Sequence, residues 1–417
     1  MLLYRLLNLL LSPLTLGYIG WKSIRHGQLR YFRNRLGVGL NHIPQGCLWL
    51  HCASVGEVNT ALPLLEELHR RNPEQKFLIT TNTPTGAQVV LGQARPYLFH
   101  AYLPFDWLLA VTLFVSGVKP AALYVLETEL WPNLFGVCHS NNIPVTIING
   151  RLSPKTTSTC KWVRNVLGQV LRLTDHIYAR SDADSNAFIE LGAVASRVST
   201  MGNLKYSPPA APVRDKPAVS RKYIVAASTH ADEEQQILDC WLKLNRNELL
   251  VIAPRHPERR EEIIRQLTRP AGSIAVRSRN DTINESTTVY LLDTVGELNN
   301  WFGNAMLVVM GGSFVPRGGH NLLEPAHFGK AVIFGPSMEN FREEAQLMLD
   351  RHAAVQVASV DELCDQLRHF LSNPEALRSL ENNVAEATAG FRHIVTDYAD
   401  IISQAINSQK KVSEECN

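Results

Sequence analysis

Short apolar runs alternate with longer amphipathic stretches along most of this 417-residue chain. The runs are rich in β-branched and aromatic residues, as in strands that are buried on both faces of a sheet. Between the runs, apolar positions recur three or four residues apart, which is typical of helices. Strands separated by helices predict parallel βαβ units. The predicted strands are Leu48 to Ala53, Phe77 to Thr81, Ala101 to Leu103, Leu123 to Leu126, Val145 to Ile148, Ile177 to Ala179, Tyr223 to Ala227, Leu249 to Ala253, Thr288 to Leu292, Leu307 to Met310, Val332 to Phe334 and Ala354 to Val357.

A proline-rich segment divides these units into two groups. Residues Ser207 to Pro212 combine prolines with small residues, which neither pack well nor form sheet ladders. A chain of this length exceeds one ordinary core and fits two domains. Two Rossmann-like domains in tandem would leave a cleft between their strand ends, where open α/β sheets bind ligands. The predicted organisation is an arm at 1–35, a first domain at 36–206, a linker at 207–220 and a second domain at 221–417.

The arm combines an apolar stretch with basic residues. Leu2 to Trp21 is mostly apolar, but polar residues, a proline and a glycine interrupt it, so it is marginal as a membrane-spanning helix. No acidic residue precedes Glu57, and no small-residue cleavage site of a secretory signal is present. We expect a membrane anchor that lies at the interface or barely spans it; the alternative is a buried first helix. The basic residues of the arm are Arg5, Lys22, Arg25, Arg30, Arg33 and Arg35.

Charge and cysteine content exclude some classes of protein. The net charge of +2 depends on the arm, because the rest of the chain has more acids than bases. Basic charge confined to one end argues against a nucleic-acid-binding surface. The seven cysteines are scattered, with no C-x-x-C and no paired histidine spacing. This spacing favours a reducing compartment and argues against a structural zinc site.

One segment of the second group has the pattern of a phosphate-binding loop. The apolar run that ends at Met310 is followed by Gly311 and Gly312, and the residues after Gly319 predict the start of a helix. Backbone N–H groups and the positive end of the helix dipole would then converge on a phosphate. Glu324, one turn inside the predicted helix, could accept hydrogen bonds from ribose hydroxyls. A glycine pair alone is weak evidence, since many turns without a ligand contain one.

Cations and hydroxyls follow other predicted strands of the same domain. Ser228, Thr229 and His230 end one strand, and Arg255 and His256 end the next. Such groups could surround the phosphate and stabilise negative charge as a leaving group departs. Each of them alone is better explained as solvated surface. Together they indicate an anion site, to which Lys205, just before the linker, would also contribute.

Glutamates follow two predicted strands of the first domain. Glu57 comes after the first strand, at the N-terminus of a predicted helix, where the helix dipole favours an ionised carboxylate and hence a general base. The ordinary placement of an acid in the first turn of a helix is the alternative. Glu127 and Glu129 follow a later strand and could position a substrate hydroxyl. Capping of the helix that begins near Trp131 explains them equally well.

A pair of aspartates could suggest a metal. Asp182 and Asp184 resemble the acidic pair that holds a divalent cation in many sugar transferases, but they follow Ser181 at a predicted helix start, where N-capping explains them. We therefore predict no metal site and no cofactor. The sequence contains neither a G-x-x-x-x-G-K-[ST] nor a G-x-S-x-G motif, so P-loop phosphoryl transfer and serine hydrolysis lack their usual signatures.

Taken together, these motifs resemble the 3-deoxy-D-manno-octulosonic acid (Kdo) transferases of bacterial lipopolysaccharide synthesis. The resemblance covers nearly the whole chain. It departs from the family at Asn149 to Leu152, where alanine is expected before Arg151. The segments that carry the resemblance are Ser54 to Glu57, Thr83 to Gly86, Glu127 to Asn133, Gly202 to Lys205, Ser228 to His230, Pro254 to Arg259, and Gly311 to Ser313 through Gly318 to Asn321 and on to Glu324.

The resemblance implies an α/β protein of GT-B fold, with two facing Rossmann-like domains and an N-terminal membrane-anchoring helix. It implies a CMP-Kdo donor, a lipid A precursor (lipid IVA) as acceptor, inversion at the anomeric carbon, and a place at the inner membrane with the catalytic domains on the cytoplasmic side. The first domain would bind the acceptor and the second the donor. Glu57 would be the catalytic base, with Ser54, Gly56, Glu127 and Glu129 on the acceptor side. The expected donor-binding residues are Lys205, Ser228, Thr229, His230, Arg255, His256, Gly311, Gly312, Ser313, Asn321 and Glu324.

Two other functions remain open at this point. A nucleotide-sugar epimerase of the same architecture would need no lipid acceptor and would gain nothing from the apolar arm. A peripheral membrane protein that binds nucleotide-sugars without turning them over would keep its role after loss of Glu57, which separates it from both enzymes.

Overall fold

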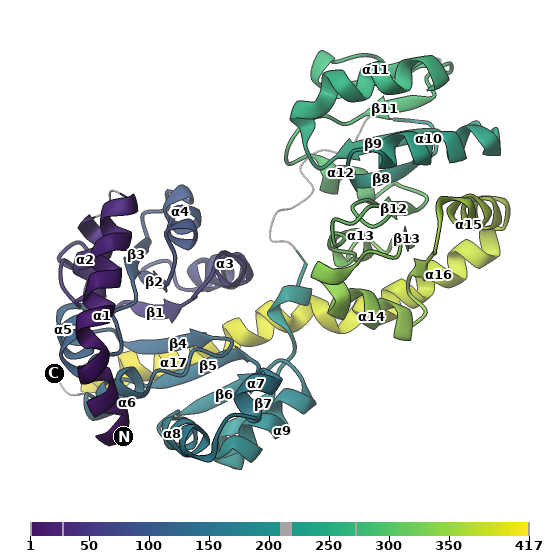
Figure 1. Ribbon diagram of the computed structural model, residues 1–417. Helices are drawn as coiled ribbons and strands as arrows, with labels where there is room; N and C mark the ends of the chain where they lie inside the picture. The colour runs from purple at the N-terminus through teal and green to yellow at the C-terminus, as the bar shows by residue number, and fades with distance from the viewer. Residues whose placement is uncertain (1, 27–28, 209–218, 272, 416–417) are drawn as a thin grey trace. The chain divides into compact units, whose positions relative to one another are not determined.

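The computed structural model describes residues 2–26, 29–208, 219–271 and 273–415 (Figure 1). The chain forms two compact units, one made of Met1–Ser207 together with His393–Asn417 and the other of Pro208–Arg392. Most of the predicted linker at 207–220 lies outside the described residues.

The first unit is built on a parallel sheet of seven strands in the order β3-β2-β1-β4-β5-β6-β7. Its central strands are buried throughout, which agrees with their continuous apolar sequences. The strands are β1 (Leu48–His51), β2 (Phe77–Thr81), β3 (Leu98–Tyr102), β4 (Ala122–Leu126), β5 (Val145–Gly150), β6 (His176–Ala179) and β7 (Val198–Thr200). The helices are α1 (Leu2–His26), α2 (Leu29–Arg35), α3 (Val55–Arg71), α4 (Pro84–Gly92), α5 (Leu108–Val118), α6 (Pro132–Ser140), α7 (Pro154–Thr157), α8 (Lys161–Arg172), α9 (Asp182–Leu191) and α17 (Ile394–Glu415), with 3-10 turns η1 (Ala195–Arg197) and η2 (Leu204–Tyr206).

The second unit repeats this plan with a parallel sheet in the order β10-β11-β9-β8-β12-β13-β14. The strands are β8 (Tyr223–Thr229), β9 (Leu249–Pro254), β10 (Ile274–Val276), β11 (Val289–Leu291), β12 (Val308–Met310), β13 (Val332–Phe334) and β14 (Val355–Gln356). The helices are α10 (Glu233–Leu244), α11 (Arg260–Ala271), α12 (Leu298–Phe302), α13 (Leu323–Ala326), α14 (Arg342–Asp350), α15 (Val360–Ser372) and α16 (Pro374–Thr388), with 3-10 turns η3 (Pro257–Arg259), η4 (Arg277–Arg279), η5 (Glu339–Phe341) and η6 (Ala389–His393).

Every strand predicted from the sequence overlaps an observed strand. The sequence pattern missed β7 and β10, which are three residues long and lie at or near a sheet edge. β7 (Val-Ser-Thr) is partly exposed, so it lacks the continuous apolar run that identifies a buried strand.

The last helix corrects the predicted domain boundary. We expected the second domain to run from 221 to 417, but α17 belongs to the first unit, where it packs against α3 (Figure 1). Tyr398, Ile402 and Ile406 are buried at a spacing of four residues, which forms one apolar helix face. The Tyr398 hydroxyl also accepts the Asn149 N–H at 3.1 Å. A helix pattern alone does not reveal which core its apolar face covers.

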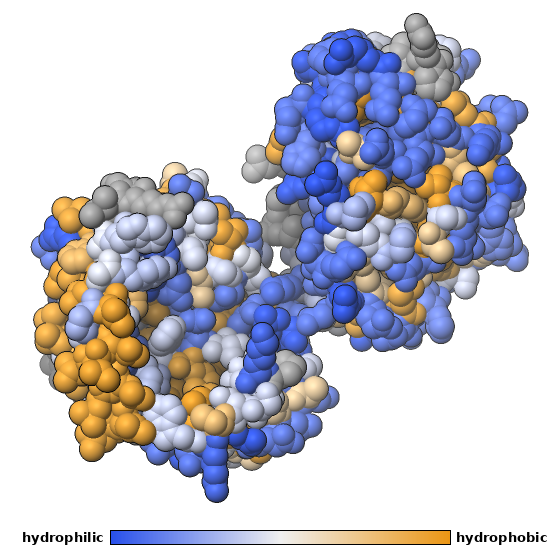
Figure 2. Space-filling view, viewed as in Figure 1, coloured by the Kyte–Doolittle hydropathy of each residue, from blue (hydrophilic) through white to orange (hydrophobic). Residues whose placement is uncertain are grey.

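Helix α1 contacts the rest of the first unit through the polar residues of one of its faces. The Tyr4 hydroxyl donates to Asp106 Oδ2 at 2.8 Å, and the Arg5 Nε donates to Asn133 Oδ1 at 3.0 Å. The other faces of α1 expose leucines, and Figure 2 shows hydrophobic surface gathered over this helix. Among the described residues, α1 is the one helix whose length and composition would allow it to cross a membrane. The most exposed leucines are Leu2, Leu9, Leu10 and Leu14.

Two basic residues of the arm, which we expected to belong to a membrane anchor, are bound to the first unit instead. Arg35 is buried, and its guanidinium donates to the Asn82 carbonyl at 2.7 Å and to the Leu103 carbonyl at 2.9 Å. Arg30 donates to the His100 carbonyl. These two arginines therefore tie α2 to the sheet, a role that charge patterning does not distinguish from contact with anionic lipid.

Two cysteines in the core of the second unit form a disulfide. Cys240 in α10 and Cys364 in α15 are paired, with their Cα atoms 5.4 Å apart. Their sequence separation of 124 residues and the absence of a spacing motif explain why the scattered cysteines gave no sign of this pair.

Candidate functional site

The predicted site residues gather where the strand order reverses in each sheet. In the first unit β1 neighbours β4; Glu57 lies in the first turn of the helix after β1, and Glu127 follows β4 directly. In the second unit β8 neighbours β12, and the following loops carry His230 and Gly311. Loops at such a switch point diverge to opposite faces of the sheet and leave the crevice in which open α/β sheets bind ligands. The predicted placement at carboxyl strand ends is thus confirmed within each unit.

The Glu57 side chain folds back onto the start of α3. Ser54 is the N-cap residue, and its Oγ accepts the Glu57 N–H at 3.3 Å. The Glu57 carboxylate accepts the Ser54 hydroxyl at 3.0 Å and the Ala53 N–H at 2.8 Å. Gly56, in the first turn, is exposed. Glu57 therefore does take part in capping α3, which was the alternative to a catalytic role. The same contacts fix the orientation of its half-buried carboxylate at the sheet edge.

The surroundings of Glu57 favour a proton acceptor. Burial raises the pKa of Glu57, and the negative charge of Glu127 raises it further, while the Ala53 amide and the Ser54 hydroxyl act in the opposite direction. We had expected the helix dipole to hold this group ionised. The net shift is upward instead, which makes the ionised carboxylate a stronger base nearer to neutral pH.

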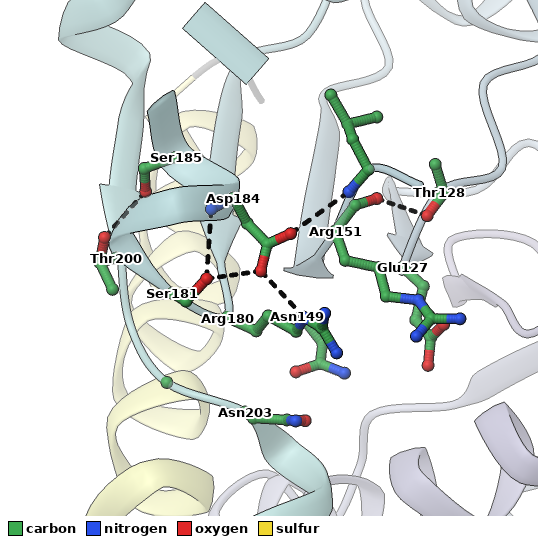
Figure 3. A network of polar contacts seen from close by, with 12 residues as sticks. Glu127, Thr128, Asn149, Arg151, Arg180, Ser181, Asp184, Ser185, Thr200 and Asn203 are labelled. Atoms are coloured by element: carbon green, nitrogen blue, oxygen red, sulfur yellow. Dashed lines mark hydrogen bonds and ion pairs between the residues drawn. The ribbon is translucent and has the colours of Figure 1, made fainter. Parts of the chain in front are cut away.

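Glu127 holds two cations. Its carboxylate pairs with Arg151 Nε at 2.9 Å and with Lys205 Nζ at 2.9 Å, as the view of this edge in Figure 3 shows for Arg151. Glu127 itself is buried and has a positive φ of 60°. The structure therefore gives Lys205, which we predicted to contact the donor phosphate, a different partner in the first unit, because η2 places it beside Glu127.

Glu129 points to other partners than Glu127, as expected for acids two residues apart. Its Oε2 accepts the Trp131 indole N–H at 2.9 Å and the Asn82 amide at 3.2 Å. These bonds and the nearby His51 outweigh burial and lower the pKa of Glu129. Helix α6 is capped instead by Asp106, which accepts the N–H groups of its first turn. The capping alternative for the two glutamates is therefore wrong.

The aspartate pair is used inside the first unit. Ser181 is the N-cap residue of α9 and its Oγ accepts the Asp184 N–H at 3.1 Å, which confirms the capping prediction. Asp184 accepts the Arg180 Nε at 2.9 Å and the Leu152 N–H at 3.4 Å (Figure 3). Asp182 accepts the Thr200 hydroxyl at 2.6 Å. Within the described residues no group of three or more histidine, cysteine or acidic side chains is arranged to hold a metal.

The glycine loop of the second unit is already hydrogen-bonded. The Gly312 N–H donates to Glu233 Oε2 at 2.7 Å and the Phe314 N–H donates to Glu233 Oε1 at 2.9 Å. The Gly311 N–H donates to the Ala227 carbonyl. The expectation that these amides are free for a phosphate is therefore wrong for Gly311 and Gly312. A Cβ on Gly311 would lie 2.6 Å from Thr229 Cα, so close backbone packing explains this glycine.

The helix after this loop is also shorter than predicted. α13 is a single turn, and Glu324 is its second residue. So short a helix has little dipole to offer a phosphate, since the effect comes from aligned peptide units. Burial raises the pKa of Glu324, and Arg255 partly opposes that shift.

Glu233 is a site residue that sequence analysis missed. It is fully buried and accepts a third backbone amide, from His230 at 2.9 Å. One carboxylate thus joins the loop after β8 to the loop after β12. The sequence shows three consecutive acids, Asp232 to Glu234, but acids are common in the first turn of a helix, so they gave no sign of this role.

A cluster of cations and histidines lies beside these loops. His230 Nε2 and His320 Nε2 are 3.0 Å apart in stacked rings, so one nitrogen must donate and the other accept. Burial lowers the pKa of both histidines, that of His320 to about 4, and neighbouring positive groups lower both further. Such mutual lowering marks an electropositive site that favours an anion. The groups whose positive charge lowers the pKa of His230 are His256, Arg317, Arg255 and Arg259.

The other predicted donor residues divide into exposed and internal groups. Arg255 and His256 are exposed, and His256 Nδ1 lies 3.1 Å from Glu258 Oε1. Thr229 donates to Glu234 at 3.1 Å, and the Ser313 hydroxyl donates to Met310 O and accepts the Gly335 N–H. Two further predicted residues shape the loops themselves. The Asn321 side chain accepts the Leu323 N–H, and Ser228 has a positive φ of 56°.

Comparison with solved structures defines the class of this fold. The UDP-GlcNAc 2-epimerase of Neisseria meningitidis, solved with UDP-GlcNAc, matches 87% of this chain and 99% of its own with a TM-score of 0.54. MurG of Acinetobacter baumannii matches 87% of this chain and 100% of its own with a TM-score of 0.53. Each is 14% identical, which shows the fold alone. The protein has a GT-B-like fold, as the resemblance implied.

Comparison of sequences identifies the family. The 3-deoxy-D-manno-octulosonic acid transferase of Haemophilus influenzae is 32% identical over 395 residues, which cover 91% of this chain and 92% of the relative. The probable mitochondrial enzyme of that name from Arabidopsis thaliana is 31% identical, covering 90% of this chain and 89% of the relative. The family model for 3-deoxy-D-manno-octulosonic-acid transferase (kdotransferase) matches residues 30–207. The chain therefore belongs to the Kdo transferases and is a glycosyltransferase.

Proposed function

We propose that this protein transfers Kdo from CMP-Kdo to a lipid A precursor, lipid IVA, with inversion and with Glu57 as the general base. In this reaction Glu57 takes the proton of an acceptor hydroxyl as that oxygen attacks the anomeric carbon and CMP leaves. The observation that carries the proposal is the Glu57 carboxylate itself, which is held at the sheet switch point by two hydrogen bonds and has a raised pKa. Inversion needs one base and a stabilised leaving group, but no nucleophile on the protein.

The second unit would bind the departing CMP. Arg255 would supply positive charge to its phosphate, and the rings of His230, His256 and His320 lie together as further hydrogen-bonding groups. Glu324 is the candidate for the ribose hydroxyls. The glycine loop then has an indirect role, since Glu233 holds its backbone and thereby fixes the place of His230. No step of this scheme requires a metal, because positive side chains can neutralise the developing charge.

An acceptor with acyl chains suits the first unit. The exposed leucines of α1 continue to a cavity of about 630 Å³ between α1 and α5, lined by apolar residues that include Leu9, Leu16, Leu108 and Leu109. Tyr4 and Arg5 hold the opposite face of α1 to the protein, which favours a helix lying along the membrane over one that crosses it. We therefore propose that the enzyme lies at the inner membrane through α1. The cytoplasmic side for its two domains is what the family resemblance implies.

Product analysis tests the reaction. The protein is incubated with CMP-Kdo and the lipid A precursor, and the lipid products are weighed by mass spectrometry. We expect a mass increase of whole Kdo residues with the intact chain and with Glu190→Gln, an exposed glutamate on α9 that serves as control. Glu57→Gln should give almost no product in the same time. Equal product from Glu57→Gln would remove this residue from the mechanism.

Membrane attachment is tested by charge placed on α1. Deleting the arm to Arg35 is a poor experiment, because Arg35 is buried and binds the sheet. The double variant Leu10→Glu and Leu14→Glu leaves these contacts intact and should shift the protein from the membrane to the soluble fraction. Val295→Glu, which charges an even more exposed apolar position in the second unit, should leave the sedimentation unchanged. Unchanged sedimentation of the double variant would contradict attachment through α1.

A further inference from the structure

A buried histidine ends the strand that leads to Glu57. His51 is the last residue of β1, and no part of it is exposed to solvent. Ala53, two residues further on, donates its N–H to the Glu57 carboxylate at 2.8 Å. The histidine is therefore close to the proposed base along the chain, and the proposed transfer reaction gives its side chain no role.

Both ring nitrogens of His51 face oxygen atoms. Nδ1 lies 3.0 Å from the Thr80 hydroxyl and 3.2 Å from the Thr80 carbonyl, both on the neighbouring strand β2. Nε2 lies 3.6 Å from Glu129 Oε2 and has no hydrogen-bond partner within the described residues. A carbonyl and an ionised carboxylate can only accept hydrogen bonds. An imidazolium, which carries an N–H on each nitrogen, suits both sides of this ring.

The Thr80 hydroxyl allows one alternative. It accepts the Trp49 indole N–H at 2.8 Å and keeps its own proton, which it could donate to Nδ1 of a neutral His51 ring. The contacts of Nδ1 alone therefore permit both forms. The charges that surround the ring decide between them.

These charges favour the imidazolium. Glu127 is paired with an arginine and a lysine, but in the described part of the chain neither Glu57 nor Glu129 forms an ion pair with either kind of residue. A buried positive charge is stable only beside an opposite charge, which Glu129 supplies to His51. Cys52 is the other buried titratable group here, and its thiol stays neutral because burial and the charges of Glu57 and Glu127 raise its pKa.

A positive charge on His51 acts on both of these carboxylates. It lowers the pKa of Glu57 and that of Glu129, against the effect of burial. A carboxylate beside a cation gives up its proton at a lower pH. A larger fraction of the enzyme then carries an ionised base near neutral pH.

We propose that His51 is the buried counter-cation of the base, an imidazolium that donates to Thr80 through Nδ1, faces Glu129 through Nε2 and keeps Glu57 ionised. The inference rests on the proposed role of Glu57 and extends it. Because the ring is fully buried, His51 acts through the two carboxylates and not by contact with a substrate. It is a positioning residue for the charge of the base.

The pH dependence of transfer tests this assignment. His51→Gln keeps a polar side chain at this position but removes the charge. We expect the acid limb of the kcat profile to move to higher pH by about one unit, which is about a tenfold loss of kcat on that limb. On the alkaline plateau kcat should change little, because Glu57 is ionised there in both proteins. The affinity for CMP should stay the same, since CMP is proposed to bind in the second unit.

His100→Gln is the matched control. His100 is a second buried histidine of the same sheet, on β3, with its Nε2 3.0 Å from the Thr81 hydroxyl. Burial and the positive neighbours Arg30 and His42 lower its pKa to about 3, so the substitution removes no charge. This variant should keep the acid limb of the parent even if its melting temperature falls. An equal shift of the limb in both variants would indicate damage to the core and would reject the role of His51.

NMR of the parent protein measures the charge on the ring without any substitution. Histidine rings labelled with 15N are observed at pH 7, and the His51 signals are identified by their contact with Thr80. We expect both nitrogens to be protonated. One protonated nitrogen, with the Thr80 hydroxyl donating to the other, would overturn the counter-cation.

Failure of this inference is distinguishable from failure of the base hypothesis. If the acid limb persists in Glu57→Gln, the limb belongs to another group and the base hypothesis fails. If the limb disappears in Glu57→Gln but stays at the parent pH in His51→Gln, Glu57 remains the base and the role of His51 is rejected.

Discussion

Two glutamates occupy the same place in the two units and have different surroundings. Glu57 lies in the first turn of the helix that follows β1, and Glu233 lies at the start of the helix that follows β8. Each accepts an N–H of the preceding loop, from Ala53 and from His230 respectively. Burial raises the pKa of both. Local sequence and helix position therefore do not separate their roles.

The two glutamates differ in how many backbone N–H groups each carboxylate accepts and in how exposed each side chain is. Glu233 is fully buried and accepts three backbone amides, two of them from the loop after β12. Glu57 accepts one backbone amide and one hydroxyl and is half-buried. A carboxylate whose oxygens are occupied by the fold serves as a structural link, whereas one that remains partly accessible can exchange a proton. The comparison predicts that Glu57 controls turnover and that Glu233 controls the donor site.

The largest effect is expected for Glu57→Gln. Glutamine keeps the shape of the side chain but cannot accept a proton, and loss of a general base typically costs about 10²–10⁴ in rate. The affinity for CMP, measured by isothermal titration calorimetry, should stay the same because CMP is proposed to bind in the second unit. Turnover near that of the parent protein would point instead to Glu127 or Glu129.

The pH profile sharpens this prediction. A base works only when it is deprotonated, so kcat should fall as the pH drops through the pKa of Glu57. Because burial raises that pKa, the fall should begin at a higher pH than for an ordinary glutamate. In Glu57→Gln the residual rate should lose this limb. A limb that persists unchanged in the variant would belong to another group.

A smaller effect, and a different one, is expected for Glu233→Gln. The amide group of glutamine would place N–H donors against at least one of the three backbone N–H groups, and a buried unsatisfied donor costs about 1–3 kcal/mol. Both the melting temperature and the CMP affinity should fall, the affinity by about tenfold. Glu375→Gln, at an exposed glutamate in the first turn of α16 in the same unit, is the matched control. Loss of turnover without loss of CMP affinity would contradict the division of roles between the two glutamates.

The sequence was sufficient for the architecture because buried parallel strands leave a direct signal. β1, β4, β8 and β12 are buried over most of their length and mainly apolar, so the loops that follow them could be identified from the sequence. The sequence could not predict that α17 returns to the first unit, because an amphipathic pattern does not specify which core the helix covers. The edge strands β7 and β10 were missed because each is only three residues long, and β7 is in addition partly exposed.

The site was predictable as a set of loops, but not as a set of contacts. The positions of Glu57, His230 and Arg255 at strand ends follow from the pattern. The pairing of Lys205 with Glu127 and the occupation of the glycine-loop amides by Glu233 depend on residues far apart in sequence. Pair formation of this kind is decided by tertiary packing, which a single sequence does not display.

Removal of an exposed cation from the second unit should give a moderate effect. Arg255→Ala is expected to weaken CMP binding about five- to tenfold, because one charge-assisted contact to phosphate is lost at a solvent-accessible position. kcat at saturating donor should change less than the affinity does. Arg265→Ala, an exposed arginine on α11, should leave CMP binding unchanged. Equal losses in both variants would indicate a general effect of charge and not a contact at the site.

The smallest expected effect concerns a fraction of a proton and tests the electrostatics of the second unit directly. The pKa of His320 is lowered to about 4 by burial and by neighbouring positive groups, so this histidine is neutral at pH 5.5 in the free protein. A bound phosphate favours the charged imidazolium, and its pKa should rise. CMP binding at pH 5.5 should therefore take up more protons in the parent protein than in His320→Gln. Calorimetry in two buffers of different ionisation enthalpy measures this uptake, and the phosphate of CMP itself contributes equally to both proteins. If the two proteins exchange the same number of protons, His320 does not face the phosphate, and the donor site lies closer to His256 and Arg255.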